Sequence, residues 1–299
     1  MVYPEVLMSA APAVSRTQPP VAVLTRHDAK AQAARLLEHG SVLLLPDLDF
    51  DIAGFEDVMF AEVSSEGSKN VSYNPATGEL KGTSAQGAVR ERLTTLVARY
   101  SDWADALVRE LAPAYAADLQ RGRTSWRPRS ADHNMSKRKD DRRLHVDAFP
   151  STPVRDRRIL RVFRNVNPQG QPRFWRVGEP FADYAARFLP HAKPLAPGAA
   201  MLMQVLGLTK GRRTAYDQLM LGLHDQAKED DAYQAAAPHW DVSFPPGATW
   251  LVFTDQVVHA ALGGRYAFEQ TFYLPLSAME EPETSPQRTL ARLAGRTLV

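Results

Sequence analysis

The chain has 299 residues, of which 44% are hydrophobic and 23% are charged, and its formal net charge is +2. This composition is typical of a folded globular protein, and so small a net charge does not indicate an acidic or basic partner. Because the chain has no cysteine and no apolar run of roughly 18 residues, disulfide scaffolds, zinc–cysteine sites, thiol nucleophiles and membrane-spanning helices are excluded.

The N-terminal region is predicted to be a tail followed by helices. Residues 1–23 are rich in Ala, Pro, Ser and Val and lack the basic start and apolar centre of a signal peptide, so we expect a flexible tail and a cytoplasmic protein. From 89 to about 119, large apolar residues recur every three or four positions, which predicts helix, either continuous or divided at Ser101-Asp102. Shorter patterns predict a helix over 28–39, a strand over 41–45, a helix over 51–60 and a loop or hairpin over 68–83.

After about residue 120 the pattern changes to short apolar runs separated by Pro- and Gly-rich turns. Such runs predict an α+β fold whose core is a double-stranded β-helix (a jelly roll, cupin-like), braced by the N-terminal helices. We expect one domain over 24–285, with helical support over about 25–119, a jelly-roll core over about 120–280, and a C-terminal tail over 286–299. The predicted strands are 159–166, 200–207, 249–255 and 267–276, and the predicted helical insertions are 181–188 and 216 to about 236.

A His-X-Asp motif, His145 and Asp147, ends a basic strand-like segment, and His259 follows a buried strand near the C-terminus. On an extended chain, side chains at i and i+2 point to the same face, so this imidazole and carboxylate can bind one ion. With a distal histidine they form the 2-His-1-carboxylate facial triad, which leaves positions on iron open for a co-substrate and oxygen. The sequence therefore predicts an iron oxygenase with these three residues as metal ligands and catalytic centre.

A second His-X-Asp motif, His239 and Asp241, competes for the same role. Only 17 residues lie between Asp241 and His259, which leaves room for one hairpin. Between Asp147 and His259 there are 111 residues, enough for the intervening strands of a barrel. The spacing therefore favours the first motif.

An oxygenase that uses 2-oxoglutarate also needs a cation for the distal carboxylate, and arginine binds carboxylates bidentately. Many such enzymes carry this arginine shortly after the distal histidine, where this chain has Glu269 and Gln270. Strand alternation puts Arg161 on the same face as its apolar neighbours at i±2, which makes it the expected replacement. Arg265 is the second candidate for binding the co-substrate.

Two clusters of basic residues, within 121–143 and 155–164, flank the motif and predict an anionic substrate. For the loop 137–143, a solvated surface is the alternative interpretation. Arg158 and Arg164 share the strand face opposite Arg161 and are expected at the surface or against the substrate. No interleaved aromatic pattern typical of nucleic-acid platforms is present, so no nucleic-acid partner is expected. The expected contacts for anionic groups of the substrate are Arg127, Arg129, Arg158 and Arg164.

Longer strings in the sequence resemble the Kdo hydroxylases, which act on the sugar acid 3-deoxy-D-manno-octulosonic acid (Kdo). The similarity runs from about residue 25 to residue 280. The strings that carry it include His145-Val-Asp-Ala-Phe-Pro150, Arg158-Ile-Leu-Arg-Val-Phe163, Phe174-Trp-Arg-Val-Gly-Glu-Pro-Phe181, Leu223-His224-Asp225 and Phe268-Glu-Gln-Thr-Phe272.

The resemblance implies an Fe(II)- and 2-oxoglutarate-dependent dioxygenase that hydroxylates C3 of the terminal Kdo of Kdo2-lipid A to give Ko. Its iron ligands would be His145, Asp147 and His259. A lipid substrate implies peripheral contact with the cytoplasmic face of the inner membrane, while homo-oligomerisation is left open. Trp126 and Trp175 are candidates for stacking on a sugar ring, with core packing as the alternative.

Two other functions remain open at this point. One is an iron oxygenase of the same fold that acts on another anionic substrate. The other is a non-catalytic jelly roll that binds anionic glycolipids. Turnover of 2-oxoglutarate separates the enzymes from the binding module.

Overall fold

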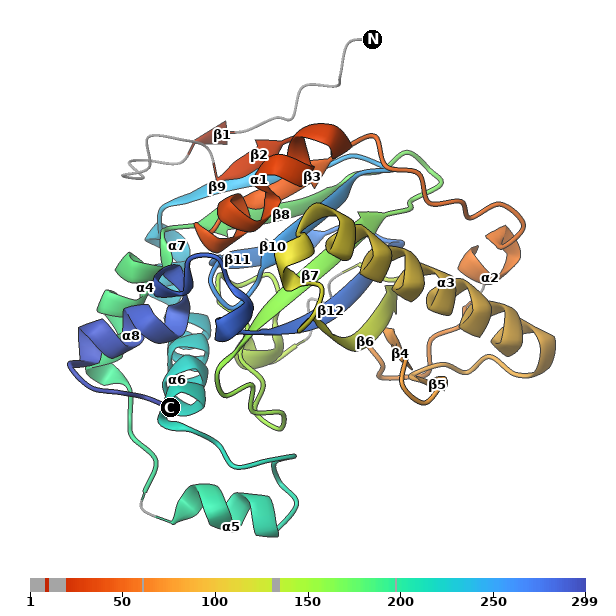
Figure 1. Ribbon diagram of the computed structural model, residues 1–299. Coiled ribbons are helices and arrows are strands. Elements are labelled where there is room, and N and C mark those ends of the chain that lie inside the picture. The colour runs from red at the N-terminus through yellow and green to blue at the C-terminus, as the bar shows by residue number, and fades with distance from the viewer. Residues whose placement is uncertain (1–8, 11–19, 61, 131–134, 197) are drawn as a thin grey trace.

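The computed structural model describes residues 9–10, 20–60, 62–130, 135–196 and 198–299. In this part of the chain, helices accompany an eight-stranded and a four-stranded sheet, both largely antiparallel, as the α+β prediction requires (Figure 1). The larger sheet has the order β2 (Val21–Val23), β3 (Val42–Leu45), β10 (Thr249–Phe253), β7 (Arg157–Asn165), β12 (Ala267–Pro275), β6 (Gln120–Arg127), β4 (Val71–Asn74) and β5 (Glu79–Lys81). The smaller sheet has the order β1 (Ser9–Ala10), β9 (His239–Phe244), β8 (Arg173–Gly178) and β11 (His259–Gly263).

The helices form two groups and one outlier. The N-terminal helices pack on the larger sheet, and they are α1 (Arg26–Glu38), α2 (Glu56–Phe60) and α3 (Gly87–Leu111). A second group lies at the end of the sheets near the first His-X-Asp motif, and it contains α4 (Phe181–Phe188), α6 (Ala215–Glu229), α7 (Asp231–Ala236) and α8 (Pro286–Ala294). The short helix α5 (Ala199–Val205) stands apart from both groups (Figure 1). Within the described ranges, no helix combines the length and the apolar character needed to cross a bilayer.

Strand β10 explains how the layers are held together. Its side chains alternate, as they must on a strand. Trp250 and Val252 point into a core shared with the smaller sheet, whereas Leu251 and Phe253 belong to the core beneath the N-terminal helices. Both faces of β10 are therefore covered, which accounts for its uninterrupted apolar sequence.

Most of the predicted elements are present. The strands predicted over 41–45, 159–166, 249–255 and 267–276 correspond to β3, β7, β10 and β12, and the insertion over 181–188 is α4. The insertion from 216 to about 236 is divided into α6 and α7. Helix α3 continues through Ser101-Asp102, so the version with two helices is wrong. Ser101 is buried and its hydroxyl bonds to Gln270, which is why this polar pair does not end the helix.

The strand predicted over 200–207 is wrong, because this stretch forms α5. Its Ala, Met, Leu and Gln residues are strong helix formers, and only Val205 is β-branched. The error came from interpreting an apolar run as buried, whereas α5 buries none of its residues. An apolar run that faces solvent gives no information about strand pairing.

The two predicted tails differ from the structure where it describes them. Residues 1–8 and 11–19 of the N-terminal segment lie outside the described residues. Within the same segment, β2 pairs in parallel with β3 as the edge of the larger sheet. At the C-terminus the segment 286–299 contains α8, which contacts α4 and buries Leu290 completely. This segment is therefore part of the fold and not a tail.

Candidate metal centre and basic pocket

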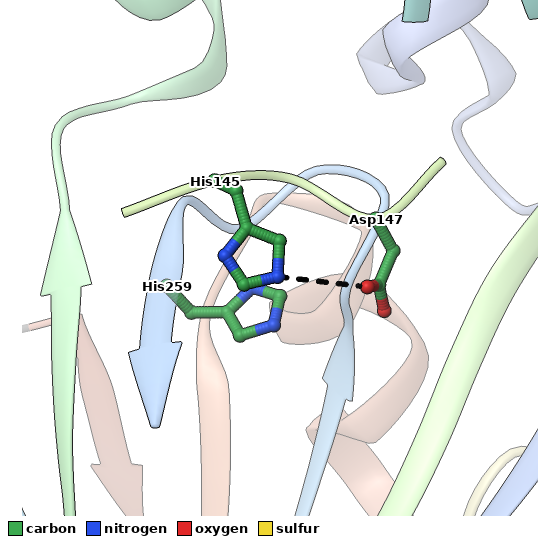
Figure 2. Close-up of side chains that lie close together, drawn as sticks. All are labelled: His145, Asp147 and His259. Carbon is green, nitrogen blue, oxygen red and sulfur yellow. Dashed lines mark ion pairs between the residues drawn. The ribbon is translucent and has the colours of Figure 1, made fainter. Parts of the chain in front are cut away.

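His145 and His259, 114 positions apart, are joined by reciprocal backbone hydrogen bonds. The His145 amide donates to the His259 carbonyl at 3.0 Å, and the His259 amide donates back at 2.8 Å. The Asp147 amide donates to the carbonyl of Thr254 at 2.8 Å. The extended segment that carries His145 and Asp147 is thereby fixed beside the start of β11, and the three side chains converge (Figure 2).

The three side chains offer a donor set that fits Fe(II). One ligand atom from each of His145, Asp147 and His259 lies within 4.8 Å of the others, and all three residues are buried. In His145 and His259, Nδ1 lies 2.7 and 2.8 Å from the backbone carbonyl two residues earlier, which it can approach only as a donor. This fixes the tautomer and leaves the lone pair on Nε2, as metal-binding histidines require. His145 Nε2 lies 3.8 Å from Asp147 Oδ1 (Figure 2).

The electrostatics of the triad suit a cation. Burial lowers the pKa of His145 and of His259, so both imidazoles are neutral at physiological pH. Burial alone would raise the pKa of Asp147, but the adjacent Arg161 guanidinium brings it below its usual value. The group therefore presents two neutral nitrogen ligands and one carboxylate, with no proton to displace.

Arg161 and Glu269 continue the site as a chain of buried ion pairs. Arg161 lies 3.0 Å from Asp147 Oδ2 and 3.0 Å from Glu269 Oε1. The other oxygen of Glu269 accepts from Arg127 Nε at 2.8 Å. Burial opposes the charge on Arg161, but the two carboxylates raise its pKa above the usual value. The guanidinium that the sequence assigned to the co-substrate is thus already engaged by two carboxylates.

Arg173, at the start of β8, is a buried cation that the sequence reasoning missed. Its Nη1 donates to the carbonyl of Gly264 at 2.9 Å, and its Nε has no hydrogen-bond partner. The pKa of Arg173 is lowered to about 10, mainly by burial and secondly by the positive charge of nearby Arg127, so Arg173 remains charged at neutral pH. Among the described residues it forms no ion pair with a carboxylate, which leaves it free to bind an anion.

These residues line two adjoining cavities. The cavity at the triad has a volume of about 310 Å³, within the usual range for small-molecule sites. A neighbouring cavity of about 370 Å³ shares several lining residues with it. Besides the triad, the residues that matter for the first cavity are Lys69, Arg127, Arg138, Lys139, Asp141, Phe149, Arg161, Arg173, Trp175, His224 and Lys228. The second cavity adds Arg129 and Ser130 and shares Lys69, Arg127, Lys139, Asp141 and Arg173. Positive side chains outnumber carboxylates in both.

Helix α6 covers the triad and contributes two further residues. The His224 ring lies edge-on to the His145 ring with centroids 5.4 Å apart. One turn later the buried Lys228 lies 3.6 Å from Asp141 Oδ1, and burial lowers its pKa. Their four-residue spacing puts both on one helix face, a pattern visible in the sequence. It was missed because nothing local indicates that this face meets the pocket.

The two tryptophans occupy different environments. Trp126 is fully buried in the core beneath the N-terminal helices, so core packing is its role. Trp175 is also buried, but it lines the triad cavity and stacks on the His259 ring at a centroid distance of 5.2 Å. Its aromatic face therefore holds one of the ligand rings in place.

The expectation that Arg158 and Arg164 contact substrate is wrong. Strand alternation is as predicted, but the face of β7 that carries them is covered by the N-terminal helices and not by solvent. Arg158 is fully buried against Asp255, and Arg164 is buried with its Nη1 2.9 Å from Thr249 Oγ1. Neither of these two arginines lines either cavity.

The structure places Arg265 outside both cavities and Arg129 at the second one. Arg265 donates to the backbone carbonyl of Pro128 and lies over the Tyr266 ring, and it lines neither cavity. Its expected role at the co-substrate therefore has no support in the geometry. Arg129 is half-exposed and paired with Glu62 at 3.0 Å, and it lines the second cavity.

Because Arg158 is a structural residue, we expect Arg158→Leu to destabilise the protein without removing the triad. Its Nε and Nη2 bind Asp255 at 2.7 and 3.2 Å, and breaking a buried pair of this kind costs about 3–5 kcal/mol. Equilibrium unfolding in urea measures the loss. Arg92→Leu, which breaks an exposed pair with Asp57, is the control and should have little effect.

The stability of the Arg158→Leu variant should depend on pH in a characteristic way. Burial already raises the pKa of Asp255 even with Arg158 present, and loss of the cation raises it further. The folded variant therefore binds a proton more tightly than the unfolded chain, so its destabilisation is greatest at high pH and shrinks as pH falls towards 3.8. A loss of stability that grows on acidification would contradict this account of Asp255.

Comparisons with known proteins identify relatives of the whole fold. A family model for 3-deoxy-D-manno-oct-2-ulosonic acid (Kdo) hydroxylase matches residues 21–297. A crystal structure of the Kdo hydroxylase KdoO, a non-heme Fe(II) alphaketoglutarate-dependent dioxygenase, in complex with cobalt(II) is similar, with a TM-score of 0.90 and 42% identity. The KdoO complex with alphaketoglutarate and Fe(III) has a TM-score of 0.88 and 41% identity. In both cases the similarity covers 94% of this chain and 98% of the other. A search of curated proteins found no match.

Proposed function

The chain belongs to the Kdo hydroxylase family, and we propose that it is an Fe(II)- and 2-oxoglutarate-dependent dioxygenase that hydroxylates Kdo in lipopolysaccharide. The specific reaction that we propose is hydroxylation at C3 of the terminal Kdo of Kdo2-lipid A, which gives Ko. The observation that carries the proposal is the convergence of His145, Asp147 and His259 in a buried pocket rich in cations.

We propose His145, Asp147 and His259 as the iron ligands and catalytic centre. Bound Fe(II) and 2-oxoglutarate supply the oxidising chemistry of such an enzyme. The protein's own contribution is positioning: backbone carbonyls orient both imidazoles, and Arg161 holds the Asp147 carboxylate. The face-to-face packing of the two sheets beside these residues supports a double-stranded β-helix as the framework.

For the carboxylate of 2-oxoglutarate that lies away from the metal, we assign Arg173 ahead of Arg161. Both line the triad cavity, but Arg161 already bridges Asp147 and Glu269. Arg173 has spare donors and no carboxylate partner among the described residues. A buried guanidinium without a carboxylate partner is stabilised more by an incoming carboxylate than one that is already paired.

For the substrate, the second cavity is the site we propose for its anionic groups. Kdo carries a carboxylate and lipid A carries phosphates, so the substrate requires several cations. Arg127 and Arg129 line this cavity, together with Lys69 and Lys139. Because the substrate is a glycolipid, we also propose that the enzyme works in the cytoplasm in peripheral contact with the inner membrane.

The test of function is anaerobic reconstitution with Fe(II), followed by exposure to air with 2-oxoglutarate, with and without Kdo2-lipid A. Substrate-stimulated succinate and a lipid product one oxygen atom heavier are the expected results. Iron-dependent succinate without stimulation would move the search to another anionic substrate. Failure to bind iron or form succinate would leave the non-catalytic glycolipid-binding module.

A further inference from the structure

Helix α5 and the turn that follows it expose an unusual cluster of apolar side chains. The exposed fractions are 64% for Met201, 58% for Leu202, 76% for Val205, 62% for Leu206 and 61% for Leu208. These residues make up half of the large apolar side chains that are exposed in the described part of the chain. Single exposed apolar residues are ordinary, but a cluster of this kind indicates an interaction surface.

Along the segment that carries this cluster, the charged side chains have one sign. Between Asp183 and Asp217 the sequence contains no Asp or Glu. Lys193, Lys210 and Arg212 are exposed, and no ion pair of theirs occurs among the described residues. Apolar side chains flanked by unpaired cations are typical of segments that insert into the interface of an anionic bilayer.

A lipid surface fits this cluster better than a second protein. Figure 1 shows α5 standing away from the body on its two connecting segments. One helix of 7 residues offers much less than the roughly 800 Å² that each partner contributes to a typical protein interface. A small protruding apolar tip can, however, enter the headgroup region of a bilayer without any complementary surface.

The segment after α5 is bonded to the rim of the triad cavity. The Lys210 amide donates to the carbonyl of Ser151 at 2.9 Å, and Arg213 Nη2 donates to the carbonyl of Pro150 at 2.6 Å. Pro150 and its neighbour Phe149 line the cavity. Whatever α5 binds is thus held beside the cavity that contains the triad.

We propose that α5 and the turn to Leu208 insert into an anionic membrane surface, with Lys193, Lys210 and Arg212 contacting lipid phosphates. This insertion holds the rim of the cavity at the bilayer, where a glycolipid headgroup emerges. The inference deepens the proposed function and rests on it for the identity of the substrate. The binding itself requires neither iron nor 2-oxoglutarate, so the two proposals can fail independently.

The test is co-sedimentation of the full chain with vesicles of phosphatidylcholine alone or mixed with phosphatidylglycerol. We expect binding to the mixed vesicles that weakens as salt is added. The double variant Leu202→Asp/Val205→Asp should bind at least about ten-fold more weakly, because it places charge in the inserted face. Val89→Asp, the same change at an exposed valine of α3, is the matched control and should bind like the wild type.

Two further measurements make the result decisive. Lys210→Gln/Arg212→Gln should reduce the preference for phosphatidylglycerol, and the aspartate variant should lose succinate formation on vesicle-bound Kdo2-lipid A but keep it on the deacylated sugar. Equal vesicle binding by the wild type and the aspartate variant would overturn the proposal. So would a wild-type dimer in sedimentation velocity that this variant converts to monomer, because α5 would then bind a second copy.

Discussion

His259→Ala is expected to abolish substrate-stimulated succinate formation and to weaken metal binding severely. Only His145 and Asp147 would remain as ligands. Even the loss of a group that merely orients a metal ligand costs about 10–100-fold in affinity, so loss of a ligand should cost about 100-fold or more. Titration with Co(II) under anaerobic conditions measures the metal affinity separately from turnover. The variant should still fold, because the hydrogen bonds that hold residue 259 in place are made by its backbone amide and carbonyl groups.

His239→Ala provides a matched control for that result. His239 and Asp241 form the second His-X-Asp motif, and the local geometry is closely similar. His239 Nδ1 lies 2.8 Å from the Ala237 carbonyl, and Nε2 lies 3.9 Å from Asp241 Oδ1. No third ligand converges on this pair among the described residues. Metal affinity and turnover should therefore stay at wild-type levels, and a loss like that of His259→Ala would mean that the wrong motif has been assigned.

Arg173→Met is expected to weaken 2-oxoglutarate binding while metal binding stays nearly unchanged. Truncating one member of a buried charge pair costs about 2–5 kcal/mol, which corresponds to a loss in affinity of about 30-fold or more. The measurement is titration of 2-oxoglutarate into the Co(II)-loaded protein. Without ligand, the cost of burying the Arg173 charge and its unpaired Nε offsets the hydrogen bond that its Nη1 donates to Gly264, so its removal should change the unfolding temperature little. A merely structural arginine would not behave in this way.

Two other arginine variants decide what the Arg173 result means. Arg176→Met removes the outward-facing arginine of the same strand, which pairs with the exposed Asp241, and should leave co-substrate affinity unchanged. The main effect of Arg161→Met should be a lower metal affinity, because the substitution leaves Asp147 and Glu269 without their shared cation. If Arg161→Met instead abolishes 2-oxoglutarate binding with metal binding intact, while Arg173→Met has no effect, the assignment passes back to Arg161.

The triad was predictable because its logic is partly local. The i, i+2 relation of His145 and Asp147 is a property of extended backbone, and spacing alone rejected Asp241. The structure brings His259 to them as that reasoning requires. Their role as iron ligands remains the prediction that His259→Ala tests.

The arginines were less predictable because their roles depend on which layer covers each strand face. Alternation correctly separated Arg161 from Arg158, but only the packing of the N-terminal helices makes the Arg158 side interior. Arg173 begins a short strand that the sequence did not predict, and its neighbours come from distant segments. The strand predicted over 200–207, where the structure has α5, was wrong for a related reason: an apolar run was assumed to be buried. In each case the missing information was which distant segments of the chain pack against the residue in the folded protein.

The reciprocal bonds between His145 and His259 also bear on the energetics of the whole molecule. The two ligand segments are 114 positions apart in the sequence and meet only in the folded structure, so the unfolded chain offers no comparable site. Every metal ion bound is then free energy added to the native state, about 2.7 kcal/mol when free metal is about 100 times its dissociation constant. The heat resistance of this protein should accordingly rise and fall with iron supply, and cells short of iron would lose the protein to proteolysis as well as its activity.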